Sequence, residues 1–111
     1  MTFTPGNDHV YNALPHVFDT DYVLELDLVN GHSHWTSMNG KSAIWHAVSG
    51  SNSYWVIGHP AQVGTLSVAM YKQSEDECVH DTNAEDWSYS HNNQWNLAGK
   101  GTFVECSTGN N

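Results

Sequence analysis

Two histidines separated by one residue, His32 and His34, are the clearest candidates for metal chemistry in the sequence. Alternate residues of a strand share one face, with Cα atoms roughly 6.5 Å apart. Two imidazoles placed in this way can chelate Zn²⁺ or Cu²⁺ at about 2.0 Å each. A functional site needs a third and usually a fourth ligand. The alternative is a polar pair on the solvent-facing side of a strand.

The turn that follows decides whether His46 joins this pair. Asn39-Gly40 is a strong hairpin signal, because both residues tolerate the backbone angles of a two-residue turn. A two-residue turn here places His32 opposite Ala47 and His46 opposite Ser33. Successive residues point to opposite faces of a sheet. With this two-residue turn His46 is predicted on the other face, where it cannot complete the metal site, whereas a bulge or a longer loop would change the register.

A second candidate site lies in the acidic segment 72–86. Its carboxylate and amide oxygens suit Ca²⁺, and their spacing resembles part of an EF-hand loop. The glycine and the terminal bidentate glutamate of that motif are absent, so a solvated acidic loop tied down by Cys78 is the alternative. The candidate calcium ligands are Asp81, Asn83, Glu85 and Asp86.

Aromatic residues form the third group of candidates. Each aromatic side chain buries about 150–250 Å², so most of them must belong to the core, and Trp55 and Trp87 are predicted there. Any exposed rings can stack on sugars, while neighbouring amides hydrogen-bond sugar hydroxyls. The candidates for glycan or partner binding are Trp35, Trp45, Trp95, Asn92, Asn93 and Gln94.

Catalysis finds little support in the sequence. Eight histidines and twelve acidic residues allow many chance pairings, but no nucleophile-elbow or zinc-protease motif is present. We therefore predict no catalytic residues and no enzyme activity. No cofactor is required, and Zn²⁺, Cu²⁺ or Ca²⁺ is the only class of cofactor that the candidate sites suggest.

The composition narrows the class of partner. The net charge is −9, with three lysines and no arginine, whereas binding to phosphate backbones depends on lysine and arginine. Nucleic acids are therefore excluded, and anionic membrane surfaces are disfavoured. No stretch of the sequence approaches the length of a membrane span. Only 14% of the residues are charged, well below the usual quarter, which favours an extracellular β-protein.

The two cysteines, Cys78 and Cys106, permit one disulfide. It would close a loop of roughly thirty residues and contribute about 3.5 kcal/mol in the chain-entropy model. Two free thiols in a reducing compartment are the alternative. The first ten residues lack the features of a signal peptide. If the protein is secreted, its signal therefore lies outside the given sequence.

The candidate residues lie in a chain whose hydrophobic residues recur with a period of two. From residue 21, Tyr22, Leu24, Leu26 and Leu28 are predicted to share one face, and Asn30-Gly31 predicts a turn. We expect an all-β domain over residues 21–111, a small antiparallel sandwich or barrel-like meander of seven or eight short strands with one disulfide. Residues 1–20 show no sustained period and predict an extended N-terminal arm or edge segment.

A series of landmarks runs through residues 28–106: Asn30-Gly31, Asn39-Gly40-Lys41, Trp45, Trp55-Val56-Ile57-Gly58, Cys78, Trp87-Ser88-Tyr89, Trp95 and Val104-Glu105-Cys106. In this order they resemble an extracellular Asn-Gly- and Trp-rich β-module repeated in mosaic proteins of marine invertebrates. The sequence departs from the module at His32 and His34, where an aromatic is usual, and at Val79, where a proline is usual. The resemblance implies an extracellular, disulfide-bearing, non-catalytic module that often accompanies lectin-like or adhesive domains.

The leading functional prediction is therefore a secreted binding or adhesive module that recognises a glycan or a protein partner. The first alternative is a structural subunit of a homo-oligomer or filament, in which residues 1–20 add a strand to the next subunit, since exposed edges invite pairing. The second alternative is a histidine-rich metal-binding protein that uses His32 and His34.

Overall fold

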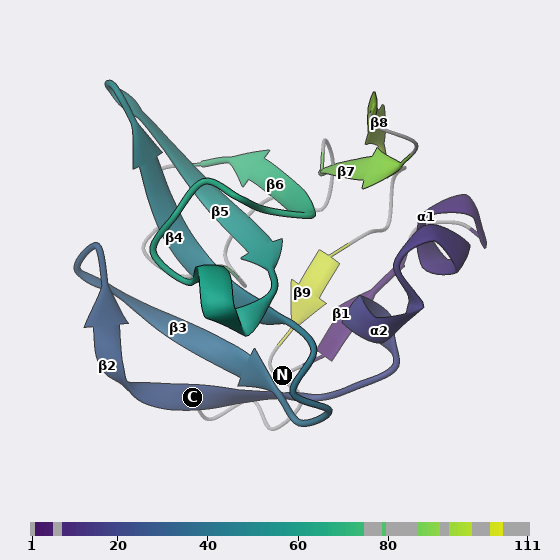
Figure 1. Ribbon diagram of the computed structural model, residues 1–111, viewed down its shortest axis with the longest axis horizontal. Helices are drawn as coiled ribbons and strands as arrows, with labels where there is room; N and C mark the ends of the chain where they lie inside the picture. The colour runs from purple at the N-terminus through teal and green to yellow at the C-terminus, as the bar shows by residue number, and fades with distance from the viewer. Residues whose placement is uncertain are drawn as a thin grey trace.

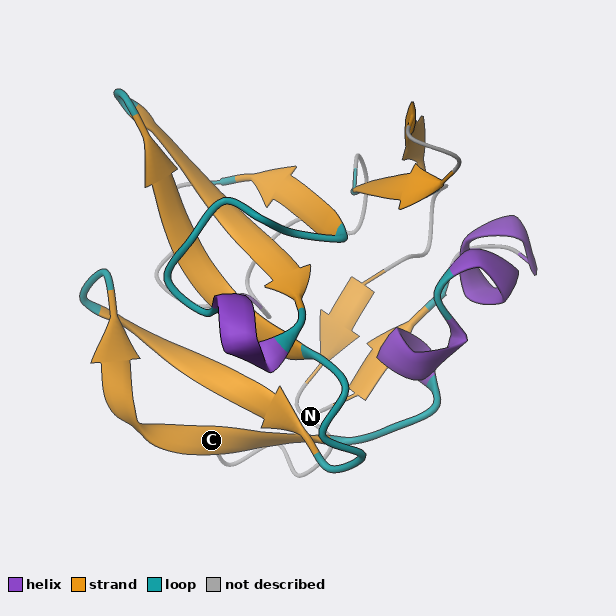
Figure 2. Ribbon diagram, viewed as in Figure 1, coloured by secondary structure: helices purple, strands orange, loops and turns teal. Residues whose placement is uncertain are grey.

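Antiparallel strands dominate the computed structural model, which describes residues 2–5, 8–74, 79, 87–91, 94–98 and 103–105 (Figure 1). The prediction of a mainly β antiparallel fold is confirmed. The short helices α1, α2 and the 3₁₀ helix η1 lie between strands in the described part of the chain (Figure 2). In chain order the elements are β1 (Thr2–Thr4), α1 (Asp8–Ala13), α2 (Pro15–Phe18), β2 (Tyr22–Val29), β3 (His32–Ser37), β4 (Ala43–Ser49), β5 (Asn52–Gly58), η1 (Pro60–Gln62), β6 (Met70–Gln73), β7 (Ser88–His91), β8 (Gln94–Leu97) and β9 (Phe103–Glu105).

Seven of these strands form one sheet in the order β2-β3-β4-β5-β6-β7-β8, so each strand pairs with its neighbour in the chain. Such a meander needs only short connections, because antiparallel neighbours can be joined by tight turns. A separate two-stranded sheet pairs β1 with β9, near the two ends of the chain. The structure thus contains one long meander and one pairing between distant segments.

Both predicted Asn-Gly turns occur between strands. Asn30 and Gly31 have φ values of 52° and 78°, as a tight hairpin turn between β2 and β3 requires. At the second turn the backbone N–H of Ser37 donates to Ser42 O at 2.9 Å, so four residues separate β3 from the returning chain. The pairing of β3 with β4 nevertheless follows the predicted register, with Trp35 opposite Ile44.

The main core lies between one face of the sheet and the N-terminal elements. Phe3 from β1 packs edge-on against both Phe18 and Trp87, with ring centroids 5.2 Å apart in each pair. Trp55 and Trp87 are fully buried in this cluster, as predicted. A smaller cluster around Trp45 and Val56 occupies the other face of the sheet.

The N-terminal segment differs from the predicted extended arm. Residues 8–13 and 15–18 are helical, and Pro15 occupies the first turn of α2, where its missing N–H costs no helical hydrogen bond. Val10 and Val17 are completely buried in the main core. Apolar burial against the sheet therefore folds this segment onto its own chain, although its sequence has no sustained helical period.

The predicted strand with Tyr22, Leu24, Leu26 and Leu28 corresponds to β2, but these residues are not buried alike. Tyr22 is buried, but the three leucines are half to fully exposed. The register between β2 and β3 shifts between Leu24 and Leu28. Moreover, β2 is the first strand of the sheet, so only β3 supports it laterally. An alternating apolar pattern marks a strand but cannot show what covers it.

The predicted disulfide falls on parts of the chain without a structural description. Cys78 and Cys106, the predicted disulfide pair, both lie outside the described residues. Within the described part, no helix is long and apolar enough to cross a membrane.

Candidate functional site

The predicted histidine site takes an unexpected form. The rings of His32 and His46 stack with their centroids 3.8 Å apart and their planes 13° apart, and both lie edge-on against Trp55. The prediction that His46 faces away from His32 is therefore wrong. The recorded pairing of β3 with β4 covers Trp35 and Thr36, and nearer His32 the two hairpins diverge (Figure 1), so simple register counting no longer applies.

His34 has a different environment from His32. Its Nε2 lies 3.7 Å from Asp27 Oδ1, and its Nδ1 is buried without a hydrogen-bond partner among the described residues.

The stacked, parallel rings of His32 and His46 do not converge on a metal in the way that ligands must. Over the described ranges no group of three or more His, Cys, Asp or Glu side chains is placed to hold a metal ion.

The predicted calcium ligands Asp81, Asn83, Glu85 and Asp86 all lie outside the described residues. The same holds for Asn92 and Asn93 of the predicted glycan site. Binding at these positions stays a prediction.

The tryptophans separate clearly by exposure. Trp35 is 6% and Trp45 0% exposed, so neither ring can stack on a sugar, and their predicted binding role is corrected on that ground. The indole N–H of Trp45 donates to Thr65 O at 3.1 Å, which satisfies its polar atom inside the protein. Trp95 is 52% exposed, and Gln94 beside it is also exposed.

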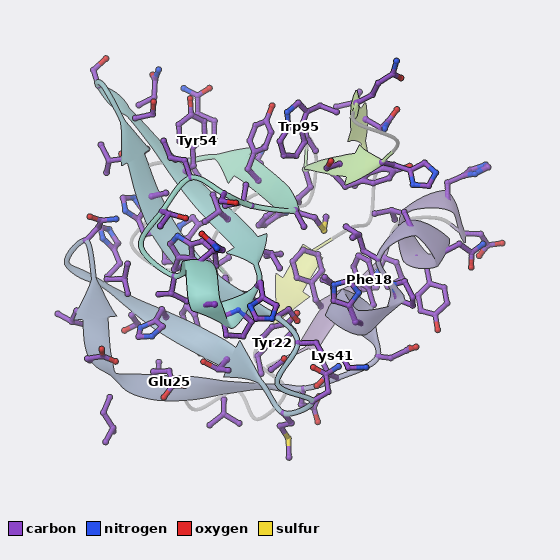
Figure 3. All side chains as sticks on the ribbon, viewed as in Figure 1. Phe18, Tyr22, Glu25, Lys41, Tyr54 and Trp95 are labelled. Atoms are coloured by element: carbon purple, nitrogen blue, oxygen red, sulfur yellow. The ribbon has the colours of Figure 1, made fainter. Side chains whose placement is uncertain are left out.

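Trp95 belongs to a row of three aromatic side chains on one face of the sheet. Tyr71 packs edge-on against Trp95 with centroids 4.8 Å apart, and Tyr54 packs edge-on against Tyr71 at 5.9 Å. We call Tyr54, Tyr71 and Trp95 the aromatic row. Figure 3 shows the side chains of Tyr54 and Trp95 rising towards the same region from β5 and β8.

The aromatic row borders an open groove of about 270 Å³, whose other lining residues are Ser49, Val56, Leu66 and Val68. Sequence reasoning missed Tyr71, Leu66 and Val68. Tyr71 reaches Tyr54 only because β6 pairs with β5, with Val56 opposite Tyr71. The segment between these strands contains η1 and an irregular loop, so no short-range signal predicts that register.

A polar pocket of about 210 Å³ adjoins one end of the row. Gln73 lies opposite Tyr54 in the sheet, and Asn52 lies opposite Ser49. Gln73 Nε2 donates to Asn52 Oδ1 at 3.2 Å. We call Asn52 and Gln73 the amide pair. Cross-strand neighbours have Cβ atoms about 4.5–5.5 Å apart, so the amide pair and the aromatic row form one continuous surface.

A further cavity of about 370 Å³ lies near His59, Gln62 and Ser90. Its titratable group is already engaged, because His59 Nδ1 accepts a hydrogen bond from the backbone N–H of Ala61 at the start of η1. The groove beside the aromatic row therefore offers the better candidate for ligand binding.

Comparison with known proteins adds no assignment: no protein-family model, curated protein or solved structure matches this chain.

Proposed function

We propose that this protein is a non-catalytic binding module that recognises a neutral glycan on the aromatic row. The observation that supports the proposal is the half-exposed indole of Trp95, held edge-on by Tyr71 at the rim of a groove. A half-exposed ring grouped with two other aromatic rings suits ligand binding, because clefts with aromatic walls and a few polar groups are the usual form of small-ligand sites.

The chemistry of a sugar ring fits this surface. One face of a pyranose presents C–H groups, which pack against the electron-rich face of an aromatic ring. Its rim presents hydroxyls, which both donate and accept hydrogen bonds. The amide pair offers matching groups: after the bond from Gln73 to Asn52, Asn52 Nδ2 stays a donor and Gln73 Oε1 an acceptor. Such a pair can engage two adjacent hydroxyls of one sugar.

The absence of charge favours a neutral sugar over a sulfated or uronic one. The described residues lining the groove and the polar pocket include no lysine and no acidic residue. Lys72 lies between Tyr71 and Gln73 on β6 but is opposite Trp55, and successive side chains point to opposite faces. With a net charge of −9, long-range attraction of an anionic glycan is also absent.

An extracellular, adhesive role belongs to the same proposal. Two observations support this role: the low share of charged residues and the resemblance to a module of extracellular mosaic proteins. In the structure β1 pairs with β9 of the same chain, which gives no support to strand addition by the N-terminal segment.

Tryptophan fluorescence can test glycan binding, because four of the five tryptophans are buried and Trp95 alone is exposed. The protein would be titrated with cello-, laminari-, chito- and mannohexaose. We expect at least one of them to change the emission saturably. Because Trp95→Ala lacks the reporting ring, its affinity would be measured by isothermal titration calorimetry beside the wild type. We expect it to bind roughly tenfold or more weakly, by analogy with the loss of about 1–3 kcal/mol when an aromatic ring that stacks on a base is removed.

Met38→Ala is a suitable control, since Met38 is 72% exposed in the turn after β3 and lies away from the groove. It should bind as the wild type does. If no hexasaccharide binds, or if Trp95→Ala binds as tightly as the wild type, the proposal is wrong.

A further inference from the structure

An exposed apolar row on β2 is a surface that glycan binding does not explain. Leu24, Leu26 and Leu28 are 51%, 103% and 63% exposed, and Val23 is 54% exposed. All four lie on the first strand of the seven-stranded sheet. The largest exposed apolar patch of a small protein is often an interaction surface.

The backbone of β2 is an edge of the sheet on the side away from β3. Its pairs with β3 run from Tyr22 to Leu24 and resume at Leu28, with a register shift between them. Edge strands normally present unpaired N–H and C=O groups to solvent, and a second strand can pair with them. Leu26 lies in the middle of this interval and is the most exposed of the four residues.

The sequence of β2 is symmetric about Leu26. Residues 23–29 read Val-Leu-Glu-Leu-Asp-Leu-Val, which is the same in either direction when the two acidic residues are treated as equivalent. In an antiparallel pair centred on Leu26, Leu24 lies opposite the partner's Leu28, and Leu26 lies opposite the partner's Leu26. A two-fold interface requires such self-complementarity.

We propose that β2 is the contact surface of a homodimer, in which a second copy of this chain pairs antiparallel with it about Leu26. The three leucines on one face of β2 and Val23 on the other together expose on the order of 400 Å² per copy, and pairing along the edge can cover both faces. Two copies with their main-chain atoms would bury about 1,000 Å², the lower limit for a specific interface. The dimer is therefore weak and depends on concentration.

The same alignment places like charges together. Glu25 lies opposite the partner's Asp27, and the symmetry repeats this contact, so two carboxylate pairs oppose association. Like charges directly opposite each other destabilise a strand pair. Salt screens such repulsion, so dimerisation should strengthen as ionic strength rises.

The other edge of the sheet is a poorer partner. β8 has only four residues, and its sequence Gln-Trp-Asn-Leu is not symmetric. Trp95 and Leu97 of β8 are exposed, so pairing of β2 with β8 of another copy is the competing arrangement. It would form open chains of molecules instead of a closed dimer.

Sedimentation velocity of the full chain over concentrations up to about 1 mM tests the dimer. The apparent mass should rise from 12.3 kDa towards twice that value and then level off. Leu26→Lys should raise the dissociation constant by about tenfold or more, since it removes the central contact and adds two facing cations. Circular dichroism would verify that Leu26→Lys is folded, since replacing a fully exposed side chain should not disturb the fold.

A charge reversal and a matched control complete the test. Glu25→Lys places a cation opposite the partner's Asp27 in both contacts, so it should lower the dissociation constant by about threefold or more and reverse the salt dependence. Leu97→Lys, on β8, should leave dimerisation unchanged. A monomeric wild type, a dimeric Leu26→Lys, an unchanged Glu25→Lys, or a loss of association in Leu97→Lys would each overturn the proposal.

Discussion

His32 and His46 stack face to face, with ring centroids 3.8 Å apart, although their strands have diverged by this point. Asn30 Nδ2 strengthens the connection by donating to His46 O at 2.8 Å. The two hairpins β2–β3 and β4–β5 are therefore held together by side chains where their recorded backbone pairing has ended. Stability at this end of the sheet should depend on the stack.

Removing one ring of the stack should destabilise the fold. We expect His32→Ala to lower the free energy of unfolding by about 1 kcal/mol, the size of an aromatic pair contribution. His91→Ala is the control, because His91 is exposed on β7. Urea unfolding measures both variants. Equal stability of His32→Ala and the wild type would show that the stack contributes nothing.

Gly58 is a position where a methyl group does not fit. A Cβ placed there would lie 2.9 Å from Cη2 of Trp45 and 3.2 Å from Ser67 O. Because Trp45 is fully buried and cannot easily shift, Gly58→Ala should cost about 1–3 kcal/mol of stability. In a double-mutant cycle, Trp45→Phe shortens the ring and should make Gly58→Ala less costly. Strict additivity would contradict this explanation.

The buried hydroxyl of Tyr22 makes two hydrogen bonds. It donates to Val17 O at 2.8 Å and lies 2.9 Å from Ser42 Oγ. Tyr22→Phe leaves both groups with one partner fewer, so thermal or urea unfolding should show a loss of about 1–2 kcal/mol. Tyr89→Phe serves as the comparison, since Tyr89 is also a buried tyrosine of the main core.

Burial also raises the pKa of Tyr22 to about 12, although the hydrogen bond with Ser42 acts in the opposite direction. The unfolded chain therefore loses this proton at a lower pH than the folded protein. The associated stability is complete below pH 10 and is lost as the pH rises through about 12. Unfolding curves across this range should converge for the wild type and Tyr22→Phe. Parallel curves would contradict the assignment.

His16 makes the stability of the fold depend on pH in the acidic range. Partial burial lowers its pKa from 6.5, and the nearby charges of Lys41 and His59 act in the same direction. The unfolded chain then binds a proton more readily than the folded protein, so the stability linked to His16 is present above pH 6.5 and declines as the pH falls below it. His16→Asn should lose less stability than the wild type when the pH falls from about 7.5 to about 5.5, roughly one pH unit on either side of an ordinary histidine pKa. An identical loss in both proteins would exclude His16.

Local patterns predict local structure well in this chain. The alternation in residues 22–29 and the two Asn-Gly pairs correctly indicate a strand and two turns, because backbone preferences of single residues decide both. Asn39 shows how much more a turn residue can do. Its Nδ2 donates to His16 O at 3.1 Å, a contact with a helix more than twenty positions earlier that no turn signal contains.

Tertiary relationships account for the errors. Trp35 and Trp45 differ from Trp95 only in what covers them, and that depends on the order of strands in the sheet. The stack of His32 on His46 depends on the divergence of two hairpins, and the helices at residues 8–18 depend on the core that they meet. The aromatic row likewise needs the four strands β5 to β8 in register, because β7 lies between Tyr71 on β6 and Trp95 on β8. Each of these requires the assembled sheet, which single-residue preferences do not describe.

The pairing of β1 with β9 has a consequence for the order of folding. Every pair in the seven-stranded sheet joins chain neighbours, whereas β1 and β9 lie at opposite ends of the sequence. Closing so long a loop is entropically costly, and non-local contacts generally slow folding. We infer that the meander forms first and that β1 docks late, when Phe3 meets Phe18 and Trp87. A smaller side chain at Phe3 should then accelerate unfolding and leave the folding rate nearly unchanged.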